Sequence, residues 1–323
     1  MYLTKTELRF RLLKYASDVI APILTGLINK SFTDGVFPGV WKCAKETALF
    51  KDGDKSLKDN YRPISILPTI SKIIERSAHI QLSSFLEENR LLSQSQFGFR
   101  LKRSTSTALI AFTDQVLESM DKGCVTGTVF LDLRKAFDTV DHLLLINKLK
   151  SLGVAGKSLE WLRSYLSGRV QQSMCVNALS PSAKITMGVP QCSMLGPLFF
   201  LVYINDIQSE LQHSKMTMFA DDMVFYFDEN SPTNLQSKLN ADLAASTSWL
   251  HDNKLLTLNV TKSKFMVIGG RNKLSQFNDT ALVSNNDQLE NVTKFKYLGE
   301  IINQHLSCHD HIEQLQSKIA KRL

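Results

Sequence analysis

Apolar residues recur at helical spacing over three stretches in the first 125 positions of the chain. These stretches are residues 8–32, 69–90 and 104–121, and in each of them apolar side chains return every three or four positions. A loop and a polar turn separate the first two stretches. The pattern predicts three amphipathic helices, each with one face directed at a core.

After position 125, short apolar runs bounded by turns become frequent. Residues 126–133 are typical of a buried strand, and residues 215–228 predict two strands that meet at an Asp pair. Residues 170–188 favour a hairpin, and residues 256–270 and 293–302 are further strand candidates. Helical spacing returns in residues 138–153, 157–169 and 189–207, and after Ser231-Pro232. Because helices and strands mix without regular alternation, the sequence predicts an α+β fold.

The composition indicates a folded protein with an anionic partner. Hydrophobic residues make up 43% of the 323 positions and charged residues 21%, so the low hydrophobicity typical of disorder is absent. The formal net charge of +7 suits nucleic acid or a membrane surface as partner. No apolar run reaches the ~18 residues that a membrane span needs, so we expect no membrane-spanning helix.

Cysteine usage and the first residues favour an intracellular protein. The five cysteines are scattered, without a CxxC pair, which disfavours a disulfide framework and fits a reducing compartment. The first residues are charged and lack the apolar core of a signal peptide. We therefore expect a nuclear or cytoplasmic protein that is not secreted.

Three aspartates stand beside apolar strands, where an unpaired charge is costly. Asp132 lies within the run VFLDL, and Asp221 and Asp222 lie at the predicted hairpin tip. Three neighbouring carboxylates would form a negative cage for hard cations, which prefer oxygen ligands. Two such ions about 3.5–4 Å apart can catalyse an in-line phosphoryl displacement. A solvated turn is the alternative for the Asp pair, and the spacing from Asp132 does not exclude it.

Seven or more ordered blocks of the sequence resemble one known family. FLDLRKAFDTVDH, GVPQCSMLGPLFFLVYINDI and FADDMVFYF match, in order and spacing, the palm motifs of reverse transcriptases encoded by non-LTR retrotransposons. The jockey-like or chicken-repeat-like group is the most similar. With the flanking blocks, the resemblance covers residues 18–320.

The resemblance implies an α+β polymerase right hand, with fingers and an antiparallel palm sheet backed by helices. Residues 1–125 would form an N-terminal extension and the fingers, and residues 126–290 the palm with inserted fingers-side helices. Residues 291–323 would form the primer-grip region and the start of a thumb that is largely missing.

The implied activity is RNA-directed DNA synthesis by two-metal nucleotidyl transfer. An RNA template, a DNA primer and deoxynucleoside triphosphates would be the partners, and two Mg²⁺ ions, which Mn²⁺ can replace, would be the cofactors. Endonuclease activity would have to come from elsewhere. The same family pattern assigns the principal metal ligands to Asp132 and Asp221, joined by the backbone carbonyl of Leu133. Asp222 would complete the catalytic acidic set.

The same resemblance implies that four further residues contact the incoming nucleotide or the template. Arg62 would reach the triphosphate, since a guanidinium fits phosphate bidentately, and Phe137 would be a steric gate against a ribose 2′-hydroxyl. Gln191 would touch the nucleotide or template face, and Lys262 would approach the pyrophosphate. The alternatives are a solvated Arg62, a Phe137 that only packs in the core, and an ordinary surface lysine at position 262.

A cluster of basic and aromatic residues precedes the second long helix. Arg100, Lys102 and Arg103 stand beside Phe97 and Phe99, a combination that would suit a template groove of charge and stacking rings. A plain solvated surface is the alternative for this patch.

The chain departs from the family pattern after the motif glutamine, where the family has GVPQGS and this sequence has Cys192 in place of the glycine. The departure leaves a second hypothesis open, a catalytically weak or inactive nucleic-acid-binding relic of a retrotransposon. A third reading, a different palm polymerase such as an RNA replicase, is disfavoured by Phe137 and by the order of the blocks.

Overall fold

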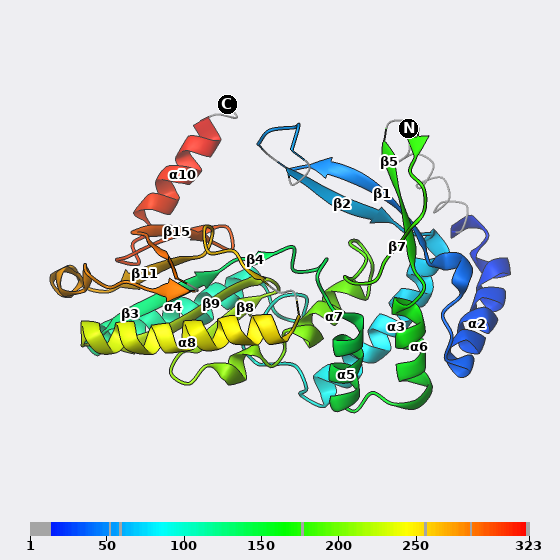
Figure 1. Cartoon of the computed structure of the whole chain (residues 1–323), viewed down its shortest axis with the longest axis horizontal. Helices are drawn as coiled ribbons and strands as arrows, with labels where there is room; N and C mark the ends of the chain where they lie inside the picture. Colours follow the sequence, from blue (N-terminus) through cyan, green and yellow to red (C-terminus); the bar gives the residue numbers. More distant parts are fainter. Residues whose placement is uncertain are drawn as a thin grey trace. The chain divides into compact units, whose positions relative to one another are not determined.

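A computed structural model describes residues 14–51, 53–57, 60–175, 178–254, 257–284 and 286–320. The chain divides into two compact units, each assembled from two stretches of sequence (Figure 1). The first unit comprises residues 1–91 and 137–203, and the second comprises residues 92–136 and 204–323. Positions 8–13 of the first predicted helix lie outside the described residues.

The first unit is built on a small sheet. Its strands are β1 (Cys43–Phe50), β2 (Tyr61–Ile66), β5 (Val170–Cys175), β6 (Ala178–Leu179) and β7 (Ala183–Lys184). The order is β2-β1-β5-β6, with β7 also paired to β5. β1 runs antiparallel to β2 and parallel to β5, so this sheet is mixed.

Helices supply most of the remaining mass of the first unit. They are α2 (Ser17–Asp34), α3 (Thr69–Glu88), α5 (His142–Ser151), α6 (Gly156–Leu166) and α7 (Gly196–Tyr203), with a 3₁₀ turn at Gly39–Trp41. Aromatic rings join α2 to α6, since Phe32 packs edge-on against Trp161 at 5.1 Å. Phe37, in the loop after α2, packs edge-on against Trp161 at 5.4 Å and Tyr165 at 5.0 Å. The helix predicted over residues 69–90 is confirmed by α3.

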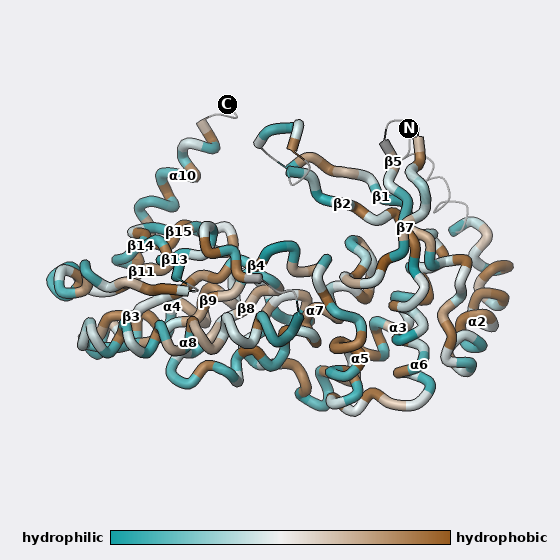
Figure 2. The backbone as a smooth tube through the Cα atoms, in the orientation of Figure 1, coloured by the Kyte–Doolittle hydropathy of each residue, from teal (hydrophilic) through white to brown (hydrophobic). Residues whose placement is uncertain are grey.

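The second unit contains the larger antiparallel sheet. Its strands are β3 (Val125–Leu131), β8 (Lys215–Phe219), β9 (Asp222–Glu229), β11 (Lys264–Ile268) and β14 (Glu290–Asn291), in the order β14-β11-β3-β9-β8. The pairs β11/β3, β3/β9 and β9/β8 are antiparallel, and only β14 runs parallel to its neighbour. Figure 2 shows β11 as a largely hydrophobic segment, which fits its place inside the sheet.

Helices cover both faces of this sheet. They are α4 (Thr105–Asp121) and α8 (Pro232–Asp252), and the unit also contains α9 (Arg271–Leu274), α10 (His309–Ala320) and 3₁₀ turns at Ile207–Glu210 and Ser275–Phe277. Phe112 of α4 packs against Phe130 and Tyr226 on one face. Gly127 lies on the opposite face, beside Leu239 of α8. Both faces of β3 are therefore buried, as its uninterrupted apolar run predicts.

Three short ribbons complete the second unit and correct the predicted strands. They are β4 (Leu133–Arg134) with β10 (Thr257–Leu258), β12 (Val283–Ser284) with β13 (Asp287–Gln288), and β15 (Lys294–Tyr297) with β16 (Glu300–Asn303). The strand expected over 256–270 is divided into β10 and β11 by a turn. The strand expected over 293–302 is a hairpin instead, because Leu298 and Gly299 both have positive φ. Among the described residues, none of the helices is both long and apolar enough to span a bilayer.

Asp242 ties the middle of α8 to the loop before β8. Its carboxylate is fully buried and accepts hydrogen bonds from the N–H groups of Gln212, His213 and Ser214, at 2.7–3.3 Å. Asp242→Ala would leave these donors without their acceptor, and we expect it to lower the free energy of unfolding by about 1–3 kcal/mol. Urea denaturation measures the change. Asp252→Ala, at the exposed end of the same helix, serves as the control and should have little effect.

Candidate active site

A tight hairpin turn brings two carboxylates to one end of the larger sheet. The pairing of Phe219 with Asp222 leaves only Ala220 and Asp221 as the turn between β8 and β9. Ala220 has φ +56°, a left-handed conformation that two-residue hairpins require at this point. The left-handed residue allows the chain to reverse at once, so Asp221 and Asp222 are adjacent at the tip.

The third carboxylate reaches the same place through strand register. Leu131, the last residue of β3, pairs with Met223 of β9, so Asp132 follows at the position opposite Asp222. Asn259 then fixes Asp132, because its Nδ2 donates to Asp132 Oδ2 at 2.9 Å and its backbone N–H donates to the Asp132 carbonyl at 2.8 Å. Asn259 has no helical or strand periodicity to identify it, and sequence reasoning missed it.

The electrostatics of Asp222 reflect this convergence. The Asp222 residue is exposed at the start of β9, but its carboxyl is partly desolvated by the residues around it. This desolvation, followed by the negative charges of Asp221 and Asp132, raises the pKa of Asp222 to about 6. Tyr297 is also close, since burial and then the charge of Asp222 raise the pKa of its phenol. The three aspartates of the second unit therefore form one coupled acidic group.

The donor chemistry of this group fits a hard divalent cation. Carboxylate oxygens are the ligands that Mg²⁺ prefers, and one or two carboxylates for each ion are enough. Within the described ranges, no three His, Cys, Asp or Glu side chains converge tightly enough to enclose a metal ion.

A cavity of about 410 Å³ opens beside the acidic group. It is lined by Thr105, Phe130, Leu131, Asp132, Phe219, Asp222, Met223, Lys262, Phe295, Lys296, Tyr297, Leu298 and Gly299. Lys262, Lys296 and several aromatic rings therefore line the same cavity as Asp132 and Asp222. Lys262 is exposed, and the turn from Asn259 to Ser263 carries it. Leu133 follows Asp132 in β4, where it pairs with Leu258 and its side chain is buried.

The other sequence-predicted residues belong to the first unit. Arg62 is exposed on β2, opposite Leu49. The ring of Phe137 is half-buried and stacks on Phe200 at 4.5 Å. Gln191 is also half-buried, and its Nε2 donates to Asp138 Oδ1 at 2.8 Å.

The loop that carries Gln191 is closely built. Gly188 approaches Asp138 so tightly that a Cβ would lie 2.7 Å from the Asp138 carbonyl oxygen. Cys192 has φ +70° and an exposed side chain. This value lies in the left-handed region, which costs a residue with a Cβ about 1–2 kcal/mol. The cysteine therefore stands where a glycine would be unstrained.

Glu75 anchors the far end of this loop, and sequence reasoning missed it. Its side chain is fully buried on α3 and accepts hydrogen bonds from the Ser71 hydroxyl at 2.7 Å and the Met194 N–H at 2.9 Å. Burial raises the pKa of Glu75, although both hydrogen bonds lower it. The only sequence signal was an acidic residue on the apolar face of a predicted helix.

The two arginines of the basic cluster before α4 make hydrogen bonds within the chain. Arg100 Nη1 donates to the Ser93 carbonyl at 2.7 Å, and Arg103 Nη1 donates to the Gln96 carbonyl at 3.1 Å. Both guanidinium groups therefore hold the backbone of residues 93–96 in place. The side chains of Phe99 and Lys102 are exposed.

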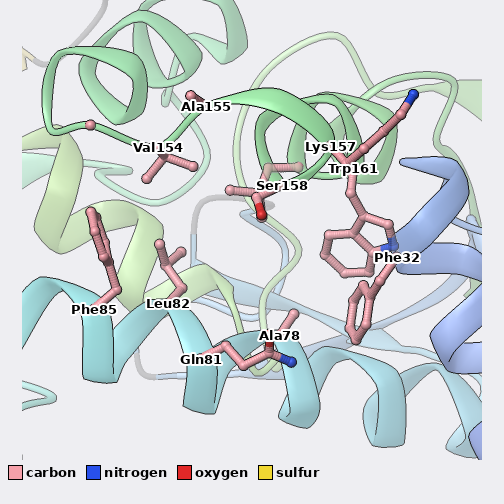
Figure 3. Close-up of a pocket in the computed structure, with 12 residues that line it drawn as sticks. Phe32, Ala78, Gln81, Leu82, Phe85, Val154, Ala155, Lys157, Ser158 and Trp161 are labelled. Atoms are coloured by element: carbon pink, nitrogen blue, oxygen red, sulfur yellow. The ribbon is translucent and has the colours of Figure 1, made fainter.

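A separate cavity of about 470 Å³ lies in the first unit among α2, α3 and α6. Figure 3 shows the rings of Phe32 and Trp161 side by side in its wall, with centroids 5.1 Å apart. Its described lining is mainly apolar and includes no carboxylate, so it does not resemble the acidic site.

An antiparallel sheet with a carboxylate pair at a hairpin turn and a third aspartate directly after the adjoining strand is typical of a right-hand polymerase. The sequence model of the family described as "Reverse transcriptase (RNA-dependent DNA polymerase)" matches residues 50–302, and the chain belongs to this family. The predicted α+β right-hand fold and the resemblance to this family are thereby confirmed.

Curated relatives come from mobile elements. The chain is 35% identical over 192 residues to the probable RNA-directed DNA polymerase from transposon X-element of Drosophila melanogaster, covering 58% of this chain and 21% of that protein. It is 27% identical over 322 residues to the RNA-directed DNA polymerase from mobile element jockey of Drosophila funebris, covering 97% and 34%. The chain thus spans only a fifth to a third of the length of these relatives.

Solved structures show the same fold. Apo telomerase from Candida tropicalis, truncated from its C-terminal domain, superposes with a TM-score of 0.57 at 12% identity, covering 84% of this chain and 55% of that one. At this identity the likeness concerns the fold alone.

Asp222→Asn is expected to raise the melting temperature of the metal-free chain at neutral pH. The folded-state pKa of about 6 exceeds the ordinary aspartate pKa of 3.8, so stability is lost as pH rises from about 4 to about 6, and the loss persists above 6. The variant lacks this loss, so its advantage should grow over that interval. Thermal denaturation in EDTA measures it. Asp287→Asn, exposed on β13, is the control, and an advantage of Asp222→Asn that stays the same at both ends of the interval would contradict the expectation.

Proposed function

We propose that the chain is the polymerase core of a non-LTR retrotransposon reverse transcriptase, which extends a primer 3′-hydroxyl on an RNA template. The observation that carries the proposal is the acidic group of the second unit, in a chain of the reverse transcriptase family. Deoxynucleoside triphosphates are the substrates and a DNA strand is the primer. Residues 126–290 are the palm, residues 1–125 the N-terminal extension and fingers, and residues 291–323 the primer-grip region with the start of the thumb.

The aspartates would hold two Mg²⁺ or Mn²⁺ ions. Asp132 and Asp221 are the principal ligands, Leu133 contributes its backbone carbonyl, and Asp222 completes the acidic group. Ions held there would supply activation of the primer hydroxyl and charge stabilisation of the leaving pyrophosphate. Asn259 orients Asp132 through the hydrogen bond to Oδ2. With a pKa of about 6, Asp222 is largely ionised at neutral pH and adds its charge to the site.

The remaining residues select and orient the nucleotide. Phe137 would exclude a ribose 2′-hydroxyl, and its stacking on Phe200 would keep the ring in place. Arg62 would bind the triphosphate, and its exposed position on β2 leaves it accessible. Gln191, oriented by Asp138, would contact the nucleotide or template face. Lys262, in the wall of the cavity beside Asp132 and Asp222, would neutralise the pyrophosphate.

The cellular setting follows from the same proposal. Cys43, Cys124, Cys192 and Cys308 are free thiols, which suits a reducing intracellular compartment, nuclear or cytoplasmic. The net charge of +7 suits RNA and DNA partners. Endonuclease activity would have to come from elsewhere.

A second candidate function is a catalytically weak retrotransposon relic that retains nucleic-acid binding. The strained Cys192 is the observation in its favour, because the loop that bears it would approach the nascent base pair. Primer extension on an RNA template with Mg²⁺ separates the two candidates. A chain that binds primer and template but does not extend them would be the relic.

Asp221→Ala is expected to abolish extension. A bound metal contributes several kcal/mol of charge stabilisation, and 1.4 kcal/mol is tenfold in rate, so the loss should be at least ~100-fold. Steady-state extension of a DNA primer on RNA with Mg²⁺ measures the loss. Asp279→Ala, an exposed aspartate of the same unit, should retain the wild-type rate. Extension without any divalent ion would exclude the mechanism.

Phe137→Ala is expected to admit ribonucleotides, because removal of the ring opens space beside the sugar 2′ position. The measurement is the ratio of deoxynucleotide to ribonucleotide incorporation, which should fall by on the order of 10-fold, as 1.4 kcal/mol of lost discrimination predicts. Phe137→Tyr keeps the ring and should keep the ratio. An unchanged ratio in the alanine variant would mean that Phe137 only packs against Phe200.

Cys192→Gly is expected to stabilise the chain and to accelerate extension. Relief of the left-handed strain should add about 1–2 kcal/mol to the free energy of unfolding. A better-aligned loop should raise the extension rate by ~10-fold, the equivalent of about 1.4 kcal/mol of barrier. Cys192→Ala keeps the Cβ and the strain, so it should show neither gain. Equal rates in the glycine variant and the wild type would remove the reason to regard this position as damaged.

A further inference from the structure

A short segment before α4 covers the outer edge of the larger sheet next to the carboxylate turn. The N–H of Phe97 donates to the Met218 carbonyl at 2.7 Å, and the N–H of Met218 donates to the Ser95 carbonyl at 2.8 Å. Gln96 and Met218 form a parallel bridge. The segment therefore pairs with β8, the edge strand, within two residues of the turn at Ala220.

The side chain of Gln96 extends this contact to the turn itself. It is 2% exposed, and its Oε1 accepts the N–H of Gly98 at 2.8 Å and the N–H of Ala220 at 2.9 Å. Both partners are donors, which fixes the orientation of the amide. One buried oxygen thus joins the segment to the left-handed residue that precedes Asp221.

Close approach of the two backbones depends on Gly98. A Cβ at this position would lie 2.3 Å from the backbone nitrogen of Ala220 and 2.9 Å from the carbonyl carbon of Phe219. These are rigid backbone atoms, so any side chain at 98 would push the turn away. The glycine makes the hydrogen bond from Ala220 to Gln96 possible.

The segment is also fastened from the outer side. Arg100 Nη1 donates to the carbonyls of Ser93 and Gln96, at 2.7 and 3.3 Å. Arg103 donates to the Gln96 carbonyl at 3.1 Å, and its guanidinium lies 4.8 Å from the centre of the Phe97 ring. The backbone of Gln96 is held on both sides, so its side chain presents Oε1 from a constrained position.

A side chain that only filled the space at position 96 would cost less free energy of folding than glutamine. The Nε2 of Gln96 is buried and has no hydrogen-bond partner among the residues that the structure describes. A buried donor without an acceptor costs about 1–3 kcal/mol, a cost that a methionine of similar length would avoid. The glutamine is therefore explained by what its Oε1 accepts.

We propose that Gln96 is a positioning residue that sets the backbone of the Ala220–Asp222 turn and thereby aims Asp221 and Asp222 at the metal ions. The catalytic consequence rests on the proposed function, whereas the effect on the turn does not. Carboxylates of like charge separate unless the backbone that carries them is held. A displacement of about 1 Å in such a site can cost 100-fold in rate.

The test compares Gln96→Met, Gln96→Glu and the matched control Gln94→Met in the full chain. Methionine fills the same space without accepting a hydrogen bond, and glutamate keeps the accepting oxygens. Gln94 is exposed, and its side chain pairs with Arg103 and not with the turn. Three quantities are measured in each variant: hydrogen exchange of the Ala220 amide, Mn²⁺ affinity by calorimetry, and the rate constant and primer-template affinity of extension.

Gln96→Met should lose the hydrogen-exchange protection of the Ala220 amide and bind Mn²⁺ at least ~10-fold more weakly. It should also extend primers ~10- to 100-fold more slowly, with its affinity for the primer-template unchanged. Gln96→Glu should retain the protection, and Gln94→Met should match the wild type in all three measurements. A merely structural role would lower the melting temperature without changing Mn²⁺ affinity in the folded protein.

Wild-type exchange protection and Mn²⁺ affinity in Gln96→Met would overturn the proposal. If Gln96→Met does not fold, Gln96→Glu tests the proposal instead. Loss of the Ala220 exchange protection in a folded Gln96→Glu variant would also overturn the proposal. A wild-type chain that binds Mn²⁺ at the aspartates but extends no primer would refute the proposed function alone, because the exchange and affinity measurements still test Gln96.

Discussion

Mutual repulsion among three carboxylates is the constraint on which this structure depends. Asp132, Asp221 and Asp222 meet at the ends of β3 and β9. Desolvation, followed by the negative charges of the other two aspartates, raises the pKa of Asp222 to about 6. Side chains alone would relax such repulsion by turning apart. The chain opposes this by fixing the backbone beneath each acid: β3/β9 register aligns Asp132 with Asp222, Asn259 holds Asp132, and the edge contact through Gln96 holds the turn.

The loop of the first unit that carries Gln191 and Cys192 follows a similar design. Buried Glu75 receives the Met194 N–H, and Gly188 packs against the Asp138 carbonyl. In both units a buried polar side chain accepts backbone donors from a tight loop, which makes the loop rigid without adding regular structure. Cys192 departs from this design, because its Cβ strains a loop whose other contacts are well formed.

The sequence alone predicted features that depend on local periodicity and chemistry. Apolar spacing predicted the helices over 69–90 and 104–121, the buried strand over 126–133 and the two strands that meet at the Asp pair. The structure contains them all, although the buried strand ends at Leu131 and Asp132 follows it. The ordered motifs identified the family, and the departure at Cys192 was visible as a substitution. These features can be predicted from the sequence because each depends on residues within about twenty positions of one another.

Tertiary structure decided which distant groups meet. No periodicity links Gln96 to Ala220 or Asn259 to Asp132, because each link joins a single loop side chain to residues more than 100 positions away. The same limit applied to Arg100 and Arg103. Their sequence context suited either a template groove or a solvated surface, and only the folded chain shows that they donate hydrogen bonds to nearby carbonyls. The sequence thus determined the elements and the acidic residues. Only the folded chain, through strand register and backbone hydrogen bonds between segments, determined how those acids are held together.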